Sequence, residues 1–188
     1  MTFSVTYPTL LLIFSLLWIA FRVCFSVKER RLRIGRECAY LTVYLCIAVV
    51  LRFTFFPFSK VDGQIAPLIL DTAAMFPPRL NLKPFIYLLD YPTKREILLN
   101  LIGNTAMFVP LGIVWPSVFR SLNTPASAIF AGFCTSLCIE VLQLPFYDRV
   151  SDIDDLILNT AGYLCGYAVY LTARAVKRIL FRKQETIK

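Results

Sequence analysis

The chain has 188 residues, of which 57% are hydrophobic and only 17% are charged. Soluble domains carry about 25% charged residues, so this composition excludes an ordinary soluble domain and predicts one integral membrane domain over residues 1–188. The formal net charge is +8. Most basic residues lie in connections beside apolar segments, which indicates membrane topology and argues against nucleic acid as a partner.

Two residue types limit the chemistry that the chain can perform. Histidine is absent, which removes the commonest general base and the commonest metal ligand. The six cysteines all lie in or beside apolar segments and form no C-x-x-C pair. We interpret them as small buried hydrophobic residues and not as disulfide partners or zinc ligands.

Five segments are apolar enough to cross a bilayer as helices, which takes about 20 residues each. In chain order they are about Val5–Phe25, Ala39–Phe58, Ile97–Phe119, Pro125–Leu144 and Leu156–Val176. The sequence therefore predicts an all-α polytopic membrane bundle. A capping box formed by Thr93 and Glu96 is expected at the start of the third span, and Pro110 is expected to kink that span.

Basic residues determine the predicted orientation. They are concentrated in the connection at 28–36 and in the tail at 177–188, and both are expected in the cytoplasm by the positive-inside rule. The N-terminus and the long loop Ser59–Glu96 are then outside. Two apolar pieces of that loop, APLILDTAAMF and KPFIYLLDY, are too short to span and are predicted to be interfacial or re-entrant.

This orientation places the polar residues of the last three spans at one depth, near the extracytoplasmic surface. Carboxylates and amides are costly in hydrocarbon, so they usually face a bundle interior or water and serve a function. The predicted functional cluster consists of Asn100, Asn104, Glu140, Gln143, Arg149, Asp152, Asp154, Asp155 and Asn159. Arg52, in the outer third of the second span, is the candidate counter-ion, with Glu140 as its expected partner.

Structural roles are alternatives for several of these residues. Ser151 and Asp154 match a capping box, and acidic residues favour helix N-termini. The amides could join neighbouring helices, and Gly162 with Gly166 would permit close helix contact. Glu140 is not explained by capping, because an acidic group is unfavourable near a helix C-terminus.

Four short motifs occur in order along the second half of the chain. They are N-L-x-P-F from Asn81 to Phe85, N-x-x-G-N-x-x-x-F-x-P-L-G from Asn100 to Gly112, E-x-x-Q from Glu140 to Gln143, and R-x-x-D-I-D-D-x-x-x-N-T-x-G-x-x-x-G from Arg149 to Gly166. Over about residues 81–167 the chain resembles the VanZ-like membrane protein family. The family's namesake is associated with low-level teicoplanin resistance in Gram-positive bacteria. The resemblance implies a multi-pass protein of the cell membrane with a role in the cell envelope.

Three hypotheses for the function remain open. The first is a non-enzymatic protein whose outer polar cluster recognises the head group of a membrane lipid or of a lipid-linked cell-wall precursor, or shields that precursor from a glycopeptide. Its expected partners are membrane lipids and either the precursor or a lipoglycopeptide. Teicoplanin carries an acyl chain that vancomycin lacks, so a protein of the outer leaflet could distinguish the two drugs. The second is an enzyme that acts on a lipid carrier or phospholipid, with Glu140, Asp152 and Asp155 as acid, base or Mg²⁺ ligands. The third is a small transporter.

The predicted orientation can be tested with single cysteines in a cysteine-free background. A cysteine at Asp62 should react with a membrane-impermeant maleimide in intact cells, because the long loop is expected outside. Cysteines at Arg31 and Gln184 should react only after the membrane is permeabilised. Labelling of Arg31 in intact cells, with Asp62 protected, would invert the orientation.

Overall fold

The computed structural model describes residues 2–29, 34–56, 60–61, 63–71, 76–85 and 93–186. Its helices are α1 (Tyr7–Glu29), α2 (Ile34–Phe55), α3 (Lys94–Val118), a short 3-10 turn η3 (Arg120–Leu122), α4 (Pro125–Gln143) and α5 (Ile153–Thr186). The five α-helices are each long and apolar enough to cross a membrane. The predicted all-α polytopic bundle is therefore confirmed, and its orientation in the membrane stays a prediction.

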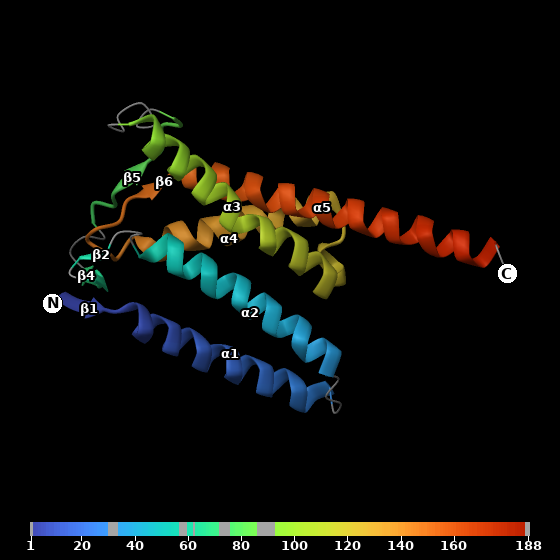
Figure 1. The fold of residues 1–188 in the computed structure, drawn as a ribbon. Helices are drawn as coiled ribbons and strands as arrows, with labels where there is room; N and C mark the ends of the chain where they lie inside the picture. Colours follow the sequence, from blue (N-terminus) through green and yellow to red (C-terminus); the bar gives the residue numbers. More distant parts are fainter. Residues whose placement is uncertain are drawn as a thin grey trace.

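Each predicted span lies on one of these helices, with ends that differ by a few residues. The largest difference is in α5, which continues past the predicted end at Val176 to Thr186. The prediction followed hydropathy, whereas the helix extends into the basic tail, and Figure 1 shows it projecting beyond the other helices. The expected cap of α3 is present on one side, because the Thr93 hydroxyl accepts the backbone N–H of Glu96 at 3.3 Å.

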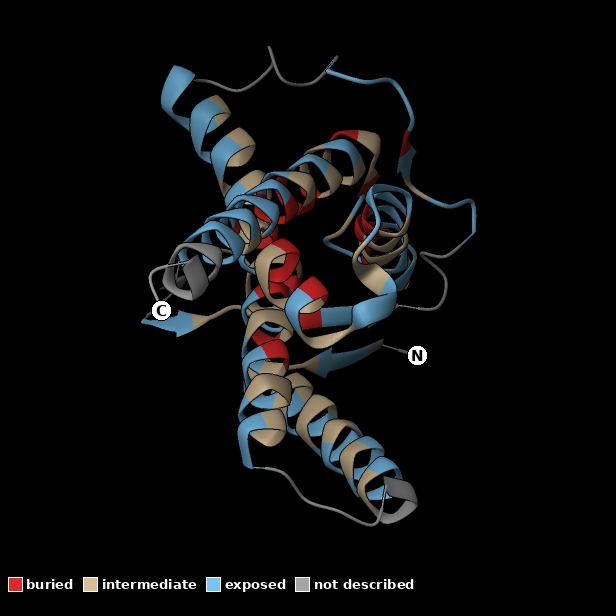
Figure 2. Cartoon of the chain, turned by 90° about the vertical axis from the view of Figure 1, so that its right-hand side faces the viewer, coloured by how far each residue is buried: buried red, intermediate tan, exposed pale blue. Residues whose placement is uncertain are grey.

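The buried core lies where α3, α4 and α5 meet α2. Phe108 and Leu111 of α3 and Tyr163 of α5 have no exposed surface. Figure 2 shows the buried positions on the inward faces of these helices. By contrast, none of the span in α1 is buried within the chain, so its sides are available to lipid.

Hydropathy predicted the spans better than it predicted burial. The six cysteines are free thiols, but Cys24, Cys38, Cys138 and Cys165 are exposed on their helices. The expectation that the cysteines are buried was wrong for these four. The physical reason is that an apolar position of a membrane helix is stable against lipid as well as against protein.

Three glycines allow α3 and α5 to approach through their backbones. A Cβ atom on Gly162 would lie 2.0 Å from the carbonyl oxygen of Thr105, and one on Gly166 would lie 2.1 Å from that of Val109. A Cβ on Gly112 would lie 2.0 Å from the carbonyl oxygen of Tyr163. The close contact expected at Gly162 and Gly166 is confirmed, and α3 is the partner helix.

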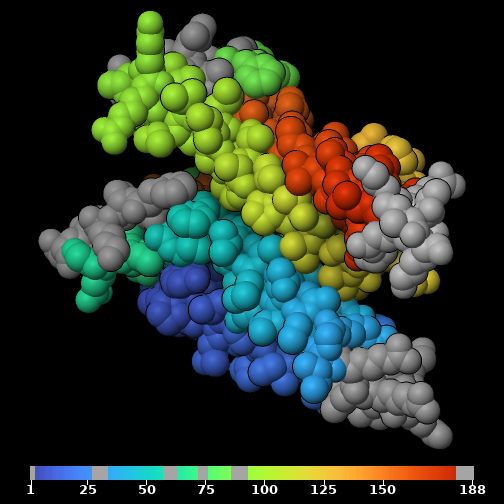
Figure 3. Space-filling view, turned by 45° about the vertical axis from the view of Figure 1, so that its right-hand side comes forward, coloured from blue at the N-terminus to red at the C-terminus, as the bar shows by residue number. Residues whose placement is uncertain are grey.

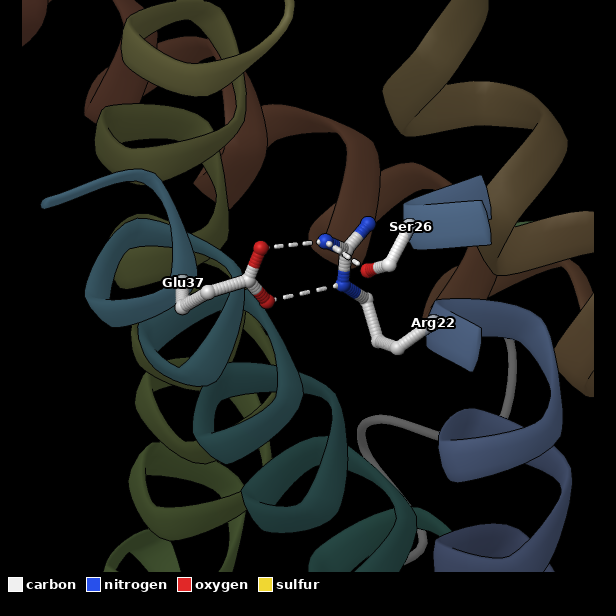
Figure 4. Close-up of polar contacts among 3 residues, drawn as sticks. All are labelled: Arg22, Ser26 and Glu37. Carbon is white, nitrogen blue, oxygen red and sulfur yellow. Dashed lines mark hydrogen bonds and ion pairs between the residues drawn. The ribbon is translucent and has the colours of Figure 1, made fainter. Parts of the chain in front are cut away.

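An ion pair joins α1 to α2 at the end opposite the N-terminus (Figure 4). The Arg22 guanidinium donates to both carboxylate oxygens of Glu37, at 2.6 and 3.2 Å, and to the Ser26 hydroxyl at 3.4 Å. It also lies 3.8 Å from the centre of the Tyr40 ring. This contact connects α1 to the bundle along the flank where Figure 3 shows α1 and α2 side by side.

Among the described residues, six short strands lie at one end of the bundle, which we call the strand end (Figure 1). They are β1 (Thr2–Val5), β2 (Lys60–Val61), β3 (Gln64–Ile65), β4 (Leu68–Asp71), β5 (Leu80–Asn81) and β6 (Ser151–Asp152). β1 pairs antiparallel with β4, β2 pairs antiparallel with β3, and β5 pairs parallel with β6. The strands thus cover the end where α1 and α5 begin and α2 and α4 end.

The strand β4 gives part of the APLILDTAAMF segment an extended conformation. Its residues Leu68–Asp71 pair with β1 and also contact the connection after α4, and the expectation of an interfacial or re-entrant segment stays a prediction. At that connection, the backbone N–H of Asp71 donates to the carbonyl of Pro145 at 2.9 Å, and that of Tyr147 donates to the carbonyl of Ile69 at 2.9 Å. Strand pairing satisfies these backbone groups, which a short apolar piece cannot do alone in lipid. Most of KPFIYLLDY lies outside the described residues.

The contact between α3 and α5 predicts a large effect of one methyl group. Gly162→Ala should lower the free energy of unfolding by about 1–3 kcal/mol or more, because the helices must separate to admit the Cβ. Gly103→Ala on α3 is the matched control, since its Cβ would meet no described neighbouring atom within 4 Å. Thermal unfolding in detergent measures both. Equal melting temperatures for the two variants would contradict the backbone contact.

Candidate functional site

The first turn of α5 is held by the carboxylate of Asp152. Both carboxylate oxygens accept from the side-chain amide of Asn81, each at 3.0 Å, and one also accepts the backbone N–H of Asp154 at 2.9 Å. Asp152 therefore caps α5. The expected cap, Ser151, instead donates its hydroxyl to the carbonyl of Glu140 at 2.6 Å, so the capping role belongs to its neighbour.

Asp154 binds the segment before α3 at a second position. Its carboxylate accepts the backbone N–H of Phe85 at 2.8 Å, and only 7% of the residue is exposed. Phe85 has a φ of 59°, in the left-handed region that non-glycine residues rarely adopt. The hydrogen bond to Asp154 helps to stabilise this conformation. Segment 80–85 is thus attached to the start of α5 through both Asp152 and Asp154.

Glu140 joins the end of α4 to the start of α5. It is 6% exposed, and its carboxylate accepts the backbone N–H of Asp152 at 2.9 Å. A charge-assisted hydrogen bond of this kind contributes about 1.5–3 kcal/mol. A buried carboxylate near a helix C-terminus is unfavourable by itself, and the Asp152 N–H offsets part of that cost.

Arg52 lies in the last turn of α2, and its expected role as the counter-ion of Glu140 stays a prediction. Its guanidinium donates to the carbonyl of Phe56 at 3.2 Å and lies 5.6 and 5.4 Å from the ring centres of Tyr7 and Phe53. The end of α2 supplies carbonyls that a cation satisfies favourably, which accounts for the contact with Phe56.

Gln143 and Arg149 attach the connection after α4 to the end of α2. The Gln143 amide donates to the carbonyl of Thr54 at 2.6 Å, and the Arg149 guanidinium donates to that of Phe55 at 2.5 Å. Both carbonyls belong to the last turn of α2, which lacks intrahelical donors. The pKa of Arg149 is lowered because the guanidinium is buried. The nearby carboxylates of Asp148 and Asp155 oppose this effect and raise the pKa, but by less.

A second group of contacts extends below the first turn of α5. The Asn104 amide of α3 donates to the carboxylate of Asp155. Ser136 of α4 donates to the backbone carbonyl of Asp155 at 3.5 Å and accepts from the Asn159 amide at 3.0 Å. Asn100 is half-buried one turn before Asn104 on α3. The predicted residues from α3, α4 and α5 therefore meet, as their helical spacing indicated.

An open pocket lies beside this polar cluster at the strand end. It has a volume of about 590 Å³ and adjoins the hydrogen bond between Asn81 and Asp152. Arg79 donates to the carbonyls of Tyr147 and Phe146, the latter at 3.2 Å, which positions its cationic group at the pocket. The lining residues are Pro78, Arg79, Leu80, Asn81, Val150 and Asp152.

One comparison with known proteins identifies the family. A family model described as VanZ/LLP1 matches residues 41–176, which is more than half of the chain. The chain belongs to the VanZ/LLP1 family. The matched range contains most of α2, all of α3 and α4 and most of α5, together with all the residues of the predicted cluster. No curated protein matches the chain, and no solved structure matches it.

Three residues that take part in the site of this VanZ/LLP1 chain were not predicted from its sequence. Asn81 belongs to the N-L-x-P-F motif, so its signal was present but was not assigned to the cluster. Arg79, two residues earlier, and Ser136, on the polar face of α4, carried no distinguishing signal. Their roles depend on contacts with Phe146 and Asn159 that are far away in sequence.

The candidate metal ligands Glu140, Asp152 and Asp155 all take part in hydrogen bonds. Within the described ranges, no group of three or more His, Cys, Asp or Glu side chains is placed to hold a metal ion. Glu140 and Asp152 instead accept hydrogen bonds from backbone or amide N–H groups, and Asp155 accepts from Asn104. A role of these carboxylates as Mg²⁺ ligands, of which one or two with water would suffice, stays a prediction.

The attachment of segment 80–85 predicts a local change in hydrogen exchange. Asp154→Ala removes the acceptor of the Phe85 N–H, so exchange at that amide should accelerate by about tenfold to a hundredfold, as expected for loss of about 1.5–3 kcal/mol. Hydrogen–deuterium exchange with mass spectrometry measures it. Asp148→Ala, which removes an exposed carboxylate nearby, is the control. Unchanged exchange in the Asp154 variant would contradict the attachment.

Proposed function

We propose that this VanZ/LLP1 protein binds the head group of a membrane lipid or a lipid-linked cell-wall precursor in the strand-end pocket, and thereby lowers susceptibility to teicoplanin. The observation that carries the proposal is the pocket of about 590 Å³ that adjoins the Asn81–Asp152 hydrogen bond. Its size is within the range of ordinary ligand sites, about 300–1,000 Å³.

The chemistry of the lining residues supports a head group that carries both signs of charge. Arg79 has five N–H donors, and its described hydrogen bonds use one donor on each terminal nitrogen. The remaining donors and the positive charge suit a phosphate. The Asp152 carboxylate supplies negative charge on the same wall, which suits an amine.

Apolar residues of the pocket support a membrane-bound ligand. Leu80 and Val150 are 47% and 52% exposed, and Pro78 lines the same pocket. A lipid head group would remain joined to an apolar chain, and these residues offer the adjoining apolar surface. This arrangement supports a site at the boundary between lipid and water.

The hydrogen bonds of the carboxylates favour binding over catalysis. Glu140, Asp152 and Asp154 each accept a main-chain N–H that fixes the turn before α5 or the loop before α3. Their main effect is to hold Asn81 and the segment around it against α5. We infer that they keep the pocket in shape, as the supporting contacts of a binding site do.

Drug susceptibility and ligand binding test the proposal together. Expression of the chain in a susceptible Gram-positive host should raise the inhibitory concentration of teicoplanin and leave that of vancomycin nearly unchanged. Asp152→Asn should abolish this protection at normal protein levels, because an amide keeps the shape but not the charge. Native mass spectrometry should show that a phosphatidylethanolamine or lipid-linked precursor dissociates more readily from this variant.

The exposed residue Asp148 provides the matched control, since Asp148→Asn removes the same charge from the same connection without changing the pocket lining. Protection that is equal in both variants would contradict the role of the pocket. If the unmodified chain binds a lipid but gives no teicoplanin-selective protection, the resistance role fails and head-group binding stands.

A further inference from the structure

Three buried polar atoms in the bundle interior have no hydrogen-bond partner among the described residues. They are Oδ1 of Asn159, the hydroxyl of Tyr163 and Nε1 of Trp115. Asn159 is 1% exposed and Tyr163 is 0% exposed. An unsatisfied buried polar group is unfavourable, and proteins commonly satisfy such groups with ordered internal water. Internal water would satisfy all three of these groups.

The unsatisfied groups continue a polar face of α5 that begins at the carboxylate cluster. Asp155, Asn159, Tyr163 and Tyr167 follow one another at intervals of four residues, so they share one face. Successive positions are separated by about 6 Å along the axis, a gap that one water molecule with two hydrogen bonds can bridge. Burial of Tyr167, at 5% exposed, shows that this face stays inside the bundle.

Polar groups from the other helices accompany this face. Ser136 of α4 contacts both the Asp155 carbonyl and the Asn159 amide. One turn deeper, the Trp115 ring of α3 packs edge-on against Tyr163 with ring centres 6.1 Å apart. The interior along α5 is therefore bordered by donors and acceptors from three helices.

The same face ends in a second polar cluster at the opposite end of the bundle. Asn123, between η3 and α4, accepts hydrogen bonds from the hydroxyls of Tyr167 and Tyr170 at 2.9 and 2.5 Å and from Arg174 at 3.4 Å. From Asp155 to Arg174, α5 rises by roughly 28 Å. The hydrocarbon core of a bilayer is about 30 Å thick, so the polar face extends across nearly all of it.

We propose that this face of α5 holds a file of internal water that conducts protons between the strand-end carboxylates and the Asn123 cluster. A proton that reaches Asp155 passes to a water hydrogen-bonded to Asn159, while the Asn159 amide keeps its own protons. Tyr163 accepts one proton on its hydroxyl oxygen and releases another, so one proton enters the file and one leaves. The groups that face or surround Asp155 are Asn104, Glu140, Arg149, Asp152 and Asp154.

Proton flux in liposomes tests the file directly. The full-length chain is reconstituted with the pH dye pyranine inside, and a potassium gradient with valinomycin drives protons across the membrane. The unmodified chain should change the pH of the lumen faster than protein-free liposomes do. Tyr163→Phe and Asn159→Leu should each reduce the protein-dependent rate by about tenfold, as expected when a relay group worth about one hydrogen bond is lost.

Two control variants distinguish the loss of a relay group from the general effect of substituting a residue. Tyr147→Phe changes an exposed tyrosine at the strand end, and Thr172→Val changes an exposed position of α5. Both should retain the full rate. Tyr163→Phe keeps the ring that packs against Trp115, so it tests the relay even if Asn159→Leu fails to fold.

Hydroxyl-radical footprinting gives a second measurement that does not depend on flux. Tyr163 should be modified although it is fully buried, because radicals form from the water beside it. Flux equal to that of protein-free liposomes, or equal flux in Tyr163→Phe and the controls, would overturn proton conduction. Protection of Tyr163 while exposed Tyr147 is modified would overturn the hydrated file.

Discussion

The backbone contact between α3 and α5 is the constraint on which the rest of the structure depends. Gly112, Gly162 and Gly166 lie where any side chain would collide with a carbonyl of the facing helix. Helices in lipid gain little from burying apolar surface against each other, so close packing of this kind contributes much of their association. The contact also fixes the helical register that lets Asn104 reach the carboxylate of Asp155.

The carboxylates at the strand end serve mainly to hold irregular backbone. A loop close to the membrane surface must satisfy its N–H and C=O groups inside the protein. Asp152 and Asp154 bind segment 80–85, Glu140 binds the turn before α5, and Arg149 binds the end of α2. A set of ionisable groups that resembles an acid–base site in sequence therefore also acts as a framework for the adjoining pocket.

The pocket and the polar face of α5 differ in their exposure to solvent. Arg79, Asn81 and Asp152 line an open pocket at the strand end, where a charged head group can remain hydrated. Asn159 and Tyr163 are buried inside the bundle, where the proposed water file would lie between close-packed helices. The head-group proposal consequently depends on residues that precede α5, and the proton-conduction proposal depends on residues within α5.

The sequence by itself determined the five spans, the membrane class and the convergence of Asn104, Asp155 and Asn159, because hydropathy and helical spacing are local properties of the chain. The order of the four motifs along the chain also indicated the family. The pairing of Asn81 with Asp152 and the strands of the long loop were decided only by the tertiary structure. Each of these depends on which distant backbone and side-chain groups come within hydrogen-bonding distance, and local pattern carries no information about that distance.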